Sequence, residues 1–325
     1  MNLRLSDAQR AQFVDEGYVM VPDLFSPEEL RPLQEEIARI VDRTADQLRQ
    51  EGRLTDVHAS EGFETRLTRL LADHPSEAGT FFRAIEGKGG GGFTGRAMYD
   101  LLTHPALLDA MEDLLGTGEV VASSVYRIRP KVPNLGRGVV PWHQDSGYFA
   151  ARCDDEMIVT CWIPLVDATE ENGCLRVLPR THLGPVVRHH TGGNAGFLVI
   201  TEEDLPAPAS EAVAVPVPLG GALLLTNRMP HCSTPNRSDT IRWSVDLRYQ
   251  ALDVPNNLSA DIEPLIPDSG EVAIACYPPE ADFVVRSRTR PETVADFQAF
   301  QRRREAFENA RIPGPNRGWQ PVATG

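Results

Sequence analysis

Two residues near the middle of the chain, His143 and Asp145, have the types and spacing of metal ligands. In an extended strand, side chains at positions i and i+2 point to the same face, so a His-x-Asp segment offers a nitrogen and an oxygen ligand side by side. Two histidines and one carboxylate on one face of an octahedral metal leave the opposite face open, which is typical of non-haem Fe(II) oxygenases. This segment alone leaves open the alternative of an exposed loop pair without chemistry.

A second histidine, His231, stands where it can complete such a site. It follows a short apolar segment at residues 222–226 that is typical of a β-strand, and Arg242 lies further along. Residues 241–249 alternate between apolar and polar side chains, so a strand there has one apolar and one polar face. We expect the apolar face to pack on helices or a second sheet and the polar face to line a wet cavity. A polar face in solvent is the alternative.

Arg242 is suited to bind a carboxylate of a co-substrate that chelates the metal. Fe(II) bound by His143, Asp145 and His231 keeps three coordination positions, of which a 2-oxo acid can chelate two and O2 can take the third. The distal carboxylate of 2-oxoglutarate then needs a cation at some distance from the metal. Because the planar fork of arginine pairs with both carboxylate oxygens, we expect Arg242 to bind that carboxylate.

The composition excludes several other classes of protein. The 325-residue chain has a net charge of −14 and a pI near 5.0, which argue against a nucleic-acid or anionic-membrane partner. It has neither a long apolar run nor a signal-peptide pattern, so we expect a cytoplasmic protein without a membrane span. The five cysteines are odd in number and include no Cys-x-x-Cys pair, which disfavours structural zinc and disulfides.

The spacing of apolar residues predicts a mainly β fold with flanking helices. Capping boxes at Ser6 and Ser26 open two N-terminal helices. Further helices are predicted near 64–72, 76–86, 105–115 and 291–309, and strands at 120–128, 157–165, 174–178, 213–218, 222–226 and 241–250. Short strands at this spacing, without helices between them, indicate an antiparallel sandwich or barrel.

We expect one domain over residues 1–325, in three consecutive parts. A mostly helical part occupies 1–118, the strand-rich core that carries the metal site occupies 119–250, and a C-terminal extension with a helix occupies 251–325. The glycine-rich segment 87–92 lacks both the preceding strand and the Gly-Lys-Ser/Thr of a phosphate loop. It is therefore predicted to be a hinge or lid element.

Several segments, in order and at suitable spacing, resemble the phytanoyl-CoA dioxygenase-like family of Fe(II)/2-oxoglutarate oxygenases. The resemblance covers most of the chain. It is carried by residues 13–22 (FVDEGYVMVP), His143-Gln144-Asp145, 162–167 (WIPLVD), 171–175 (ENGCL), 178–182 (LPRTH), His231-Cys232-Ser233 and Arg242.

This resemblance implies a fold, a cofactor set and site residues. The fold is a double-stranded β-helix, also called a jelly-roll or cupin-like core, and the cofactors are Fe(II), 2-oxoglutarate as co-substrate and O2. It implies that His143, Asp145 and His231 bind iron. It further implies that four residues contact 2-oxoglutarate, namely Gln144, Trp162, Ser233 and Arg242, the last by a salt bridge. In related halogenases Gly or Ala replaces the carboxylate ligand, so the Asp145 of this chain favours hydroxylation.

Two further cations are candidates for substrate binding. Lys131 precedes the metal-binding segment, and family analogy makes it a substrate or lid contact, with a solvated lysine as the alternative. Arg248 shares the predicted polar strand face with Arg242 and is expected to face substrate, unless it pairs with Asp246 or another acid. Among the other histidines, His182 is expected to be structural. His189 and His190 are expected in a solvated loop, or else at the cavity mouth.

These observations together predict an oxygenase that hydroxylates an unactivated C–H bond of a small molecule, with release of succinate and CO2. Desaturation, epoxidation, rearrangement and epimerisation start from the same cofactors and stay open. Two alternatives of other classes are a metal-binding jelly-roll protein without catalysis and a metal-dependent isomerase or lyase. Of the 32 basic residues only Lys88 and Lys131 are lysines, which suggests a GC-rich genome and favours a natural-product intermediate as substrate.

Overall fold

The structure, a computed structural model, describes residues 4–86, 94–193, 196–256, 258, 281–309 and 317–322. Its helices are α1 (Asp7–Glu16), α2 (Pro27–Gln50), α3 (Arg66–Asp73), α4 (Ala78–Glu86), α5 (Arg96–Leu102), α6 (Pro105–Leu115) and α7 (Phe297–Asn309). Its strands are β1 (Tyr18–Val21), β2 (Glu119–Ala122), β3 (Arg127–Lys131), β4 (Ile158–Pro164), β5 (Leu175–Val177), β6 (His190–Thr191), β7 (Val213–Val215), β8 (Ala222–Thr226), β9 (His231–Ser233), β10 (Arg242–Ala251), β11 (Phe283–Ser287) and β12 (Gln320–Pro321). None of the described helices is both long enough and apolar enough to cross a membrane.

Two antiparallel sheets form the centre of the molecule. The larger sheet has the order β1-β8-β4-β10-β2-β11, with β3 also paired to β10, and the smaller one has the order β7-β5-β9. An apolar layer lies between them, to which the larger sheet contributes Trp162, Leu223 and Leu225 and the smaller one Leu175 and Val177. The predicted antiparallel sandwich, of the jelly-roll kind, is therefore confirmed.

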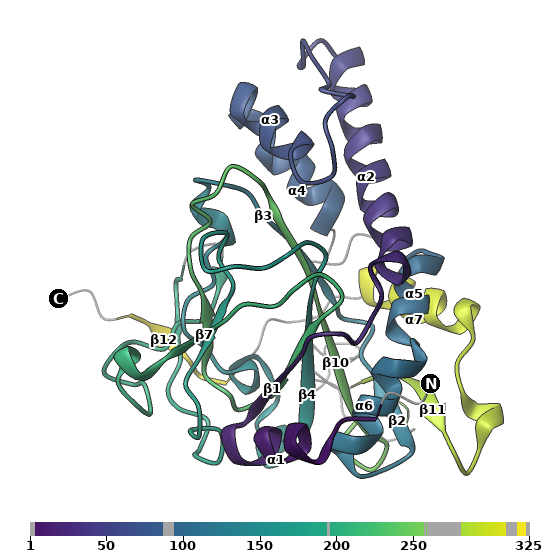
Figure 1. Ribbon diagram of the computed structural model, residues 1–325, viewed down its shortest axis with the longest axis vertical. Helices are drawn as coiled ribbons and strands as arrows, with labels where there is room; N and C mark the ends of the chain where they lie inside the picture. The colour runs from purple at the N-terminus through teal and green to yellow at the C-terminus, as the bar shows by residue number, and fades with distance from the viewer. Residues whose placement is uncertain are drawn as a thin grey trace.

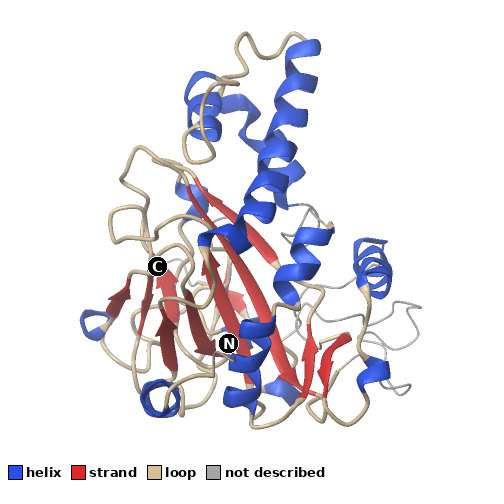
Figure 2. Cartoon of the chain, turned by 45° about the vertical axis from the view of Figure 1, so that its right-hand side comes forward, coloured by secondary structure: helices blue, strands red, loops and turns tan. Residues whose placement is uncertain are grey.

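The other face of the larger sheet is covered by helices (Figures 1 and 2). Trp243, Val245 and Leu247 of β10 belong to one core cluster with apolar side chains of α2 and α6. Arg242, Ser244 and Asp246 of β10 lie on the opposite face and are buried, and Arg248 on that face is partly buried, so the alternation read from residues 241–249 is confirmed. In Figure 1, α2, α3 and α4 extend beyond the sheets, while α5, α6 and α7 lie along the right-hand side.

Two boundaries differ from the sequence prediction. The predicted strand 120–128 is divided, because β2 pairs with the end of β10 and β3 pairs with its beginning. Between β2 and β3, the Ser124 backbone N–H and hydroxyl both donate to the Asp282 carboxylate. These bonds fix the segment in which the chain passes from β2 to β3. The last helix begins at Phe297, because Asp296 accepts a hydrogen bond from the Ala299 N–H and caps it.

Other predicted features are settled only in part. The capping boxes at Ser6 and Ser26 are both formed, and Gly17 ends α1 in the left-handed conformation. Segment 87–92 lies outside the described residues, and so does Cys276. The other four cysteines are buried and form no disulfide. The division of one domain at residues 118 and 250 stays a prediction.

Candidate active site

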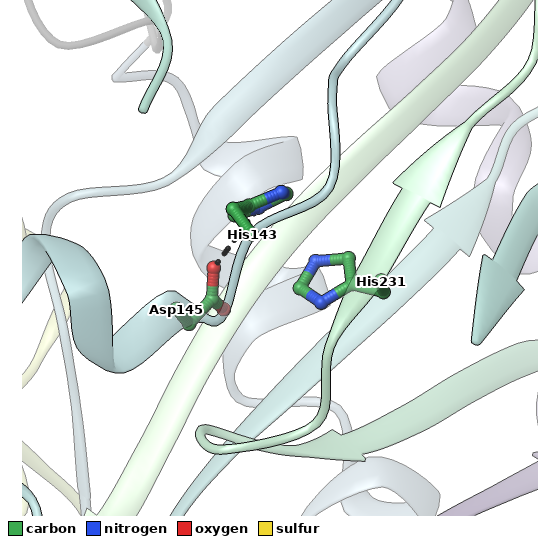
Figure 3. A group of neighbouring side chains, drawn as sticks. All are labelled: His143, Asp145 and His231. Carbon is green, nitrogen blue, oxygen red and sulfur yellow. Dashed lines mark ion pairs between the residues drawn. The ribbon is translucent and has the colours of Figure 1, made fainter. Parts of the chain in front are cut away.

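The structure brings the three predicted metal ligands together (Figure 3). His143, Asp145 and His231 are buried, and each offers a ligand atom within 4.8 Å of the other two. The Nε2 atom of His143 lies 3.6 Å from Oδ1 of Asp145. Two nitrogens and one oxygen in a buried cluster of this size match the donor set of a facial metal site.

A short backbone bridge holds the two histidines opposite each other. The His143 N–H donates to the His231 carbonyl at 3.0 Å, and the His231 N–H donates back to the His143 carbonyl at 2.9 Å. Their ring centroids lie 4.2 Å apart. The chain stays extended through Gln144 and then turns into a 3₁₀ helix, η4 (Asp145–Tyr148). The predicted strand thus ends at Asp145, but the extended Gln144 still places both ligands on one face.

Backbone carbonyls orient both rings so that Nε2 faces the shared space. Nδ1 of His143 lies 2.9 Å from the Pro141 carbonyl, and Nδ1 of His231 lies 2.9 Å from the Met229 carbonyl. A carbonyl only accepts, so each ring carries its proton on Nδ1 and leaves the Nε2 lone pair free for a metal. Burial, together with the neighbouring His143, lowers the pKa of His231 to about 4, so this ring is neutral at pH 7.

Asp145 is ionised because polar partners offset its burial. Arg248 donates to both carboxylate oxygens, with Nη2 at 3.1 Å from each, and the Thr160 hydroxyl donates to Oδ2. Burial alone raises the pKa of Asp145, but Arg248 outweighs it and holds that pKa well below its ordinary value. Of the two possibilities for Arg248, facing substrate or pairing with an acid, the structure shows the second. Its acidic partner is Asp145, the proposed metal ligand.

A cavity lined by residues of both sheets opens beside this cluster. Arg242 and Trp162 line it, and Arg242 is almost fully buried. The guanidinium centre of Arg242 lies 5.1 Å from the Trp162 ring centroid, and its Nη1 donates to the Ser244 hydroxyl at 2.6 Å. Its Nε atom is buried and has no hydrogen-bond partner in the described part of the chain. A buried donor of this kind is costly to leave unpaired, so the site fits an incoming anion.

Lys131 and Ser233 lie at the same end of the cavity. Lys131 is opposite Arg242 in the β3–β10 register, and its ammonium donates to the Ser233 hydroxyl at 2.8 Å and to the Thr234 carbonyl. Ser233 lines the cavity, so Lys131 supports it from behind. Burial, then the positive charges of Arg242 and Arg129, lower the pKa of Lys131 to about 6. The alternative of a solvated lysine is thereby excluded.

Gln144 does not face the cavity, which corrects the role that the family resemblance implied for its side chain. Its Nε2 donates to the Arg228 carbonyl at 2.8 Å, and its Oε1 accepts from the Val187 N–H at 2.8 Å. The reason is the same alternation that aligns His143 with Asp145, since the residue between them must point to the opposite side.

The remaining histidines have structural contacts. His182 packs on α1, with its Nε2 at 3.1 Å from the Val14 carbonyl, as a structural residue would. His189 and His190 are buried, so their predicted placement in a solvated loop is wrong. Nε2 of His189 accepts from the Gln144 N–H at 3.0 Å, and His190 pairs with Asp204 at 2.7 Å.

Comparisons with known proteins agree with this geometry. The family model described as phytanoyl-CoA dioxygenase (PhyH) matches residues 13–244. The chain is 26% identical over 259 residues to phytanoyl-CoA dioxygenase domain-containing protein 1 of Danio rerio, covering 73% of this chain and 87% of the relative. It is 25% identical over 248 residues to a probable alpha-ketoglutarate-dependent hypophosphite dioxygenase of Stutzerimonas stutzeri, covering 75% and 78%.

A solved structure shares the fold. The apo non-heme monooxygenase ThoJ superposes with a TM-score of 0.54 at 20% sequence identity, over 93% of this chain and 97% of that one. Fold, site and family match define the class of the protein as an oxygenase that uses Fe(II), 2-oxoglutarate and O2. The chain belongs to the phytanoyl-CoA dioxygenase family.

Replacing Arg248 tests the charge balance at Asp145. In metal-free Arg248→Gln we expect the free energy of unfolding at pH 7 to fall by about 3–5 kcal/mol, because a buried carboxylate loses its main cation. Since the folded-state pKa of Asp145 lies below its ordinary value, its stabilising contribution is present above pH 4 and is lost as the pH falls further. The difference between the variant and the original protein should therefore shrink in acid. Urea unfolding at pH 7 and at a pH below 3 measures it.

The matched control is Arg176→Gln, because among the described residues the Arg176 guanidinium donates to the Ala209 and Ala212 carbonyls and to no acid. Equal stability of Arg248→Gln and the original protein at pH 7 would contradict the role of this ion pair.

Proposed function

We propose that the protein hydroxylates a C–H bond of a small molecule at Fe(II) held by His143, Asp145 and His231. One O2 and one 2-oxoglutarate are consumed for each alcohol formed, and succinate and CO2 are released. The observation that carries this proposal is the pairing of two features in one cavity. A three-residue ligand cluster and a buried arginine, whose Nε has no partner among the described residues, both line it.

The ligand cluster fits Fe(II) by its donor set and its charge. The Nε2 atom of each histidine is available, and the carboxylate is ionised. When bound, iron supplies the redox chemistry that activates O2, and the protein supplies positioning and electrostatics. Arg248 and Thr160 hold Asp145 in place, and partners that orient a metal ligand in this way also tune metal affinity.

Arg242 is proposed to bind the distal carboxylate of 2-oxoglutarate, with Ser233 beside it and Trp162 against its guanidinium. Lys131 then contributes a second positive charge behind Ser233. This assignment revises the predicted substrate-binding role of Lys131, because its ammonium lies at the cation-rich end of the cavity. A charged pair in a buried cavity is stronger than the same pair in water, so the distal carboxylate is held at Arg242.

The cavity lining contains a second ion pair. Arg129 donates to Oδ2 of Asp246 at 2.5 Å, and Oδ1 of Asp246 is buried without a hydrogen-bond partner among the described residues. We propose a polar small molecule whose hydroxyl or ammonium group donates to this oxygen. The hypophosphite dioxygenase relative, by its name, acts on a small oxyanion, which supports a small substrate.

A natural-product intermediate stays our proposal for the substrate, on the strength of the lysine-poor composition. A cytoplasmic location is proposed because four buried cysteines remain unpaired, as reducing conditions favour. Desaturation, epoxidation and rearrangement share the same cofactors and would be separated from hydroxylation by product analysis. A metal-binding barrel without catalysis would have no use for the unsatisfied Arg242.

Succinate formation tests the reaction class. Purified protein with Fe(II), ascorbate, O2 and 2-oxoglutarate is expected to form succinate slowly even without substrate, and Asp145→Ala should abolish this activity. Thr160→Val, which keeps all three ligands, is the matched control and should retain part of it. Succinate formation by Asp145→Ala at the original rate would exclude the proposed metal site.

Removing Arg242 should weaken 2-oxoglutarate binding. Arg242→Ala deletes a charge-assisted contact of about 1.5–3 kcal/mol, which corresponds to about a ten- to hundredfold rise in the 2-oxoglutarate concentration required. The succinate assay measures it. In Arg176→Ala, which loses an arginine outside the cavity, the requirement should be unchanged. An unchanged requirement in Arg242→Ala would show that the carboxylate binds elsewhere.

Binding of 2-oxoglutarate should take up a proton at Lys131. The pKa of Lys131 is lowered to about 6 in the free protein, so above pH 6 its amine is mostly uncharged. A nearby dianion favours the charged form and raises this pKa, so the affinity for 2-oxoglutarate should fall as the pH rises from 6 to 8. Calorimetry of the Co(II)-saturated protein in two buffers of different ionisation enthalpy reports the proton. Lys131→Met should remove both the uptake and the pH dependence, and an identical pH dependence in this variant would contradict the assignment.

A further inference from the structure

We propose that residues 317–321, here called the C-terminal strap, position the turn that carries Asp145 and thereby slow the release of the metal. The proposal rests on the metal site proposed above and concerns η4 (Asp145–Tyr148). The strap includes β12, which pairs in parallel with β6. In Figure 1 the strap lies at the left, far from α7 in the view, beside the part of the molecule that contains β7.

Arg317 binds the backbone of the turn from outside. Its Nη1 donates to the Ser146 carbonyl at 3.0 Å and to the Phe149 carbonyl at 3.1 Å. The same guanidinium forms a two-pronged ion pair with Asp154, at 2.5 and 2.6 Å. Because Asp154 fixes the fork and the side chain is mostly buried, the two carbonyls are held in a defined direction.

Trp319 binds the same turn at a second point. Its indole Nε1–H donates to the Gly147 carbonyl at 2.8 Å, and its ring lies 5.3 Å from the His189 ring. The Arg317 guanidinium lies 5.3 Å from the Trp319 ring centroid, so the two strap residues also support each other. Three carbonyls of the turn and its exit are therefore held by two side chains of the strap.

His189 completes the support on the other side of Asp145. It accepts the Gln144 N–H at 3.0 Å, directly before the ligand. A Cβ added at Gly147 would lie 2.4 Å from the His189 ring, which shows how closely the turn packs on this histidine. The backbone before Asp145 is thus held by His189, and the backbone after it is held by the strap.

The physical consequence concerns preorganisation of the ligand. The direction of the Asp145 carboxylate depends on the backbone angles of Gln144 to Ser146, and a short 3₁₀ helix has few internal hydrogen bonds to fix them. Without the strap, the carbonyls of Gly147 and Phe149 would lose these donors and the Ser146 carbonyl would keep the Phe149 N–H, so we expect the turn to sample other conformations. Partners that orient metal ligands typically contribute about 10- to 100-fold to metal affinity.

The test uses the full chain loaded with Co(II) and measures metal transfer to a chelator. Arg317→Ala should release the metal about 10- to 100-fold faster than the original protein. Trp319→Phe keeps an aromatic ring but lacks the N–H donor, so its release rate should lie between those of Arg317→Ala and the original protein. Gln320→Ala is the matched control, because that exposed side chain donates to the Gly318 carbonyl within the strap and, in the described part of the chain, makes no hydrogen bond to the turn. Hydrogen exchange of segment 143–149 in the metal-free protein should rise in the first two variants alone, while the unfolding transition in urea stays in place.

The outcomes distinguish a failure of the strap proposal from a failure of the proposed metal site. If the original protein binds Co(II) and Asp145→Ala does not, the site exists. Strap variants that then release metal at the original rate would overturn the inference and leave the proposed function intact. Absence of Co(II) binding in the original protein would instead overturn the proposed function. If Arg317→Ala does not fold, Arg317→Lys keeps the charge and loses the fork, and metal release from it at the original rate would count against the strap.

Discussion

The His143–His231 backbone bridge is the constraint on which the rest of the site depends. Two backbone hydrogen bonds join the segment before η4 to β9. They place the two imidazoles next to each other through the backbone alone. Because the bridge is antiparallel, it also fixes which face of the chain Asp145 occupies. Carbonyls two positions before each histidine then select the tautomer, so one local geometry, repeated at both residues, prepares both nitrogen ligands.

The charges that line the cavity differ in how far they are compensated. Arg248 and Arg129 are each bound to an aspartate, Asp145 and Asp246 respectively, so their charges are largely compensated. Arg242 has a serine as its hydrogen-bond partner, and within the described part of the chain its buried Nε has none. A carboxylate that enters the cavity therefore meets its strongest attraction at Arg242, whereas a metal cation meets its strongest attraction at Asp145.

Much of the fold and part of the site could be predicted from local patterns in the sequence. The alternation in β10 identified both the face packed on helices and the face that lines the cavity, since period-two spacing survives in any strand. The same rule predicts that Gln144 points away from its neighbours, so alternation was a better guide there than the role implied by the family. Two contacts of Asp145, the ion pair with Arg248 and the hydrogen bond from the Thr160 hydroxyl, could not be predicted from any local sequence pattern. Residues 103 positions apart meet only through the sheet, and β4 is buried on both faces.

The position of the strap in the chain has a consequence for biosynthesis. Arg317 and Trp319 are made after every other described element that they contact, including the turn that they hold. A chain synthesised only as far as β11 can form the sheets and the histidine bridge, yet the backbone around Asp145 still lacks its outer support. Iron capture during synthesis would then favour a chain that already includes the strap over one that has not reached it.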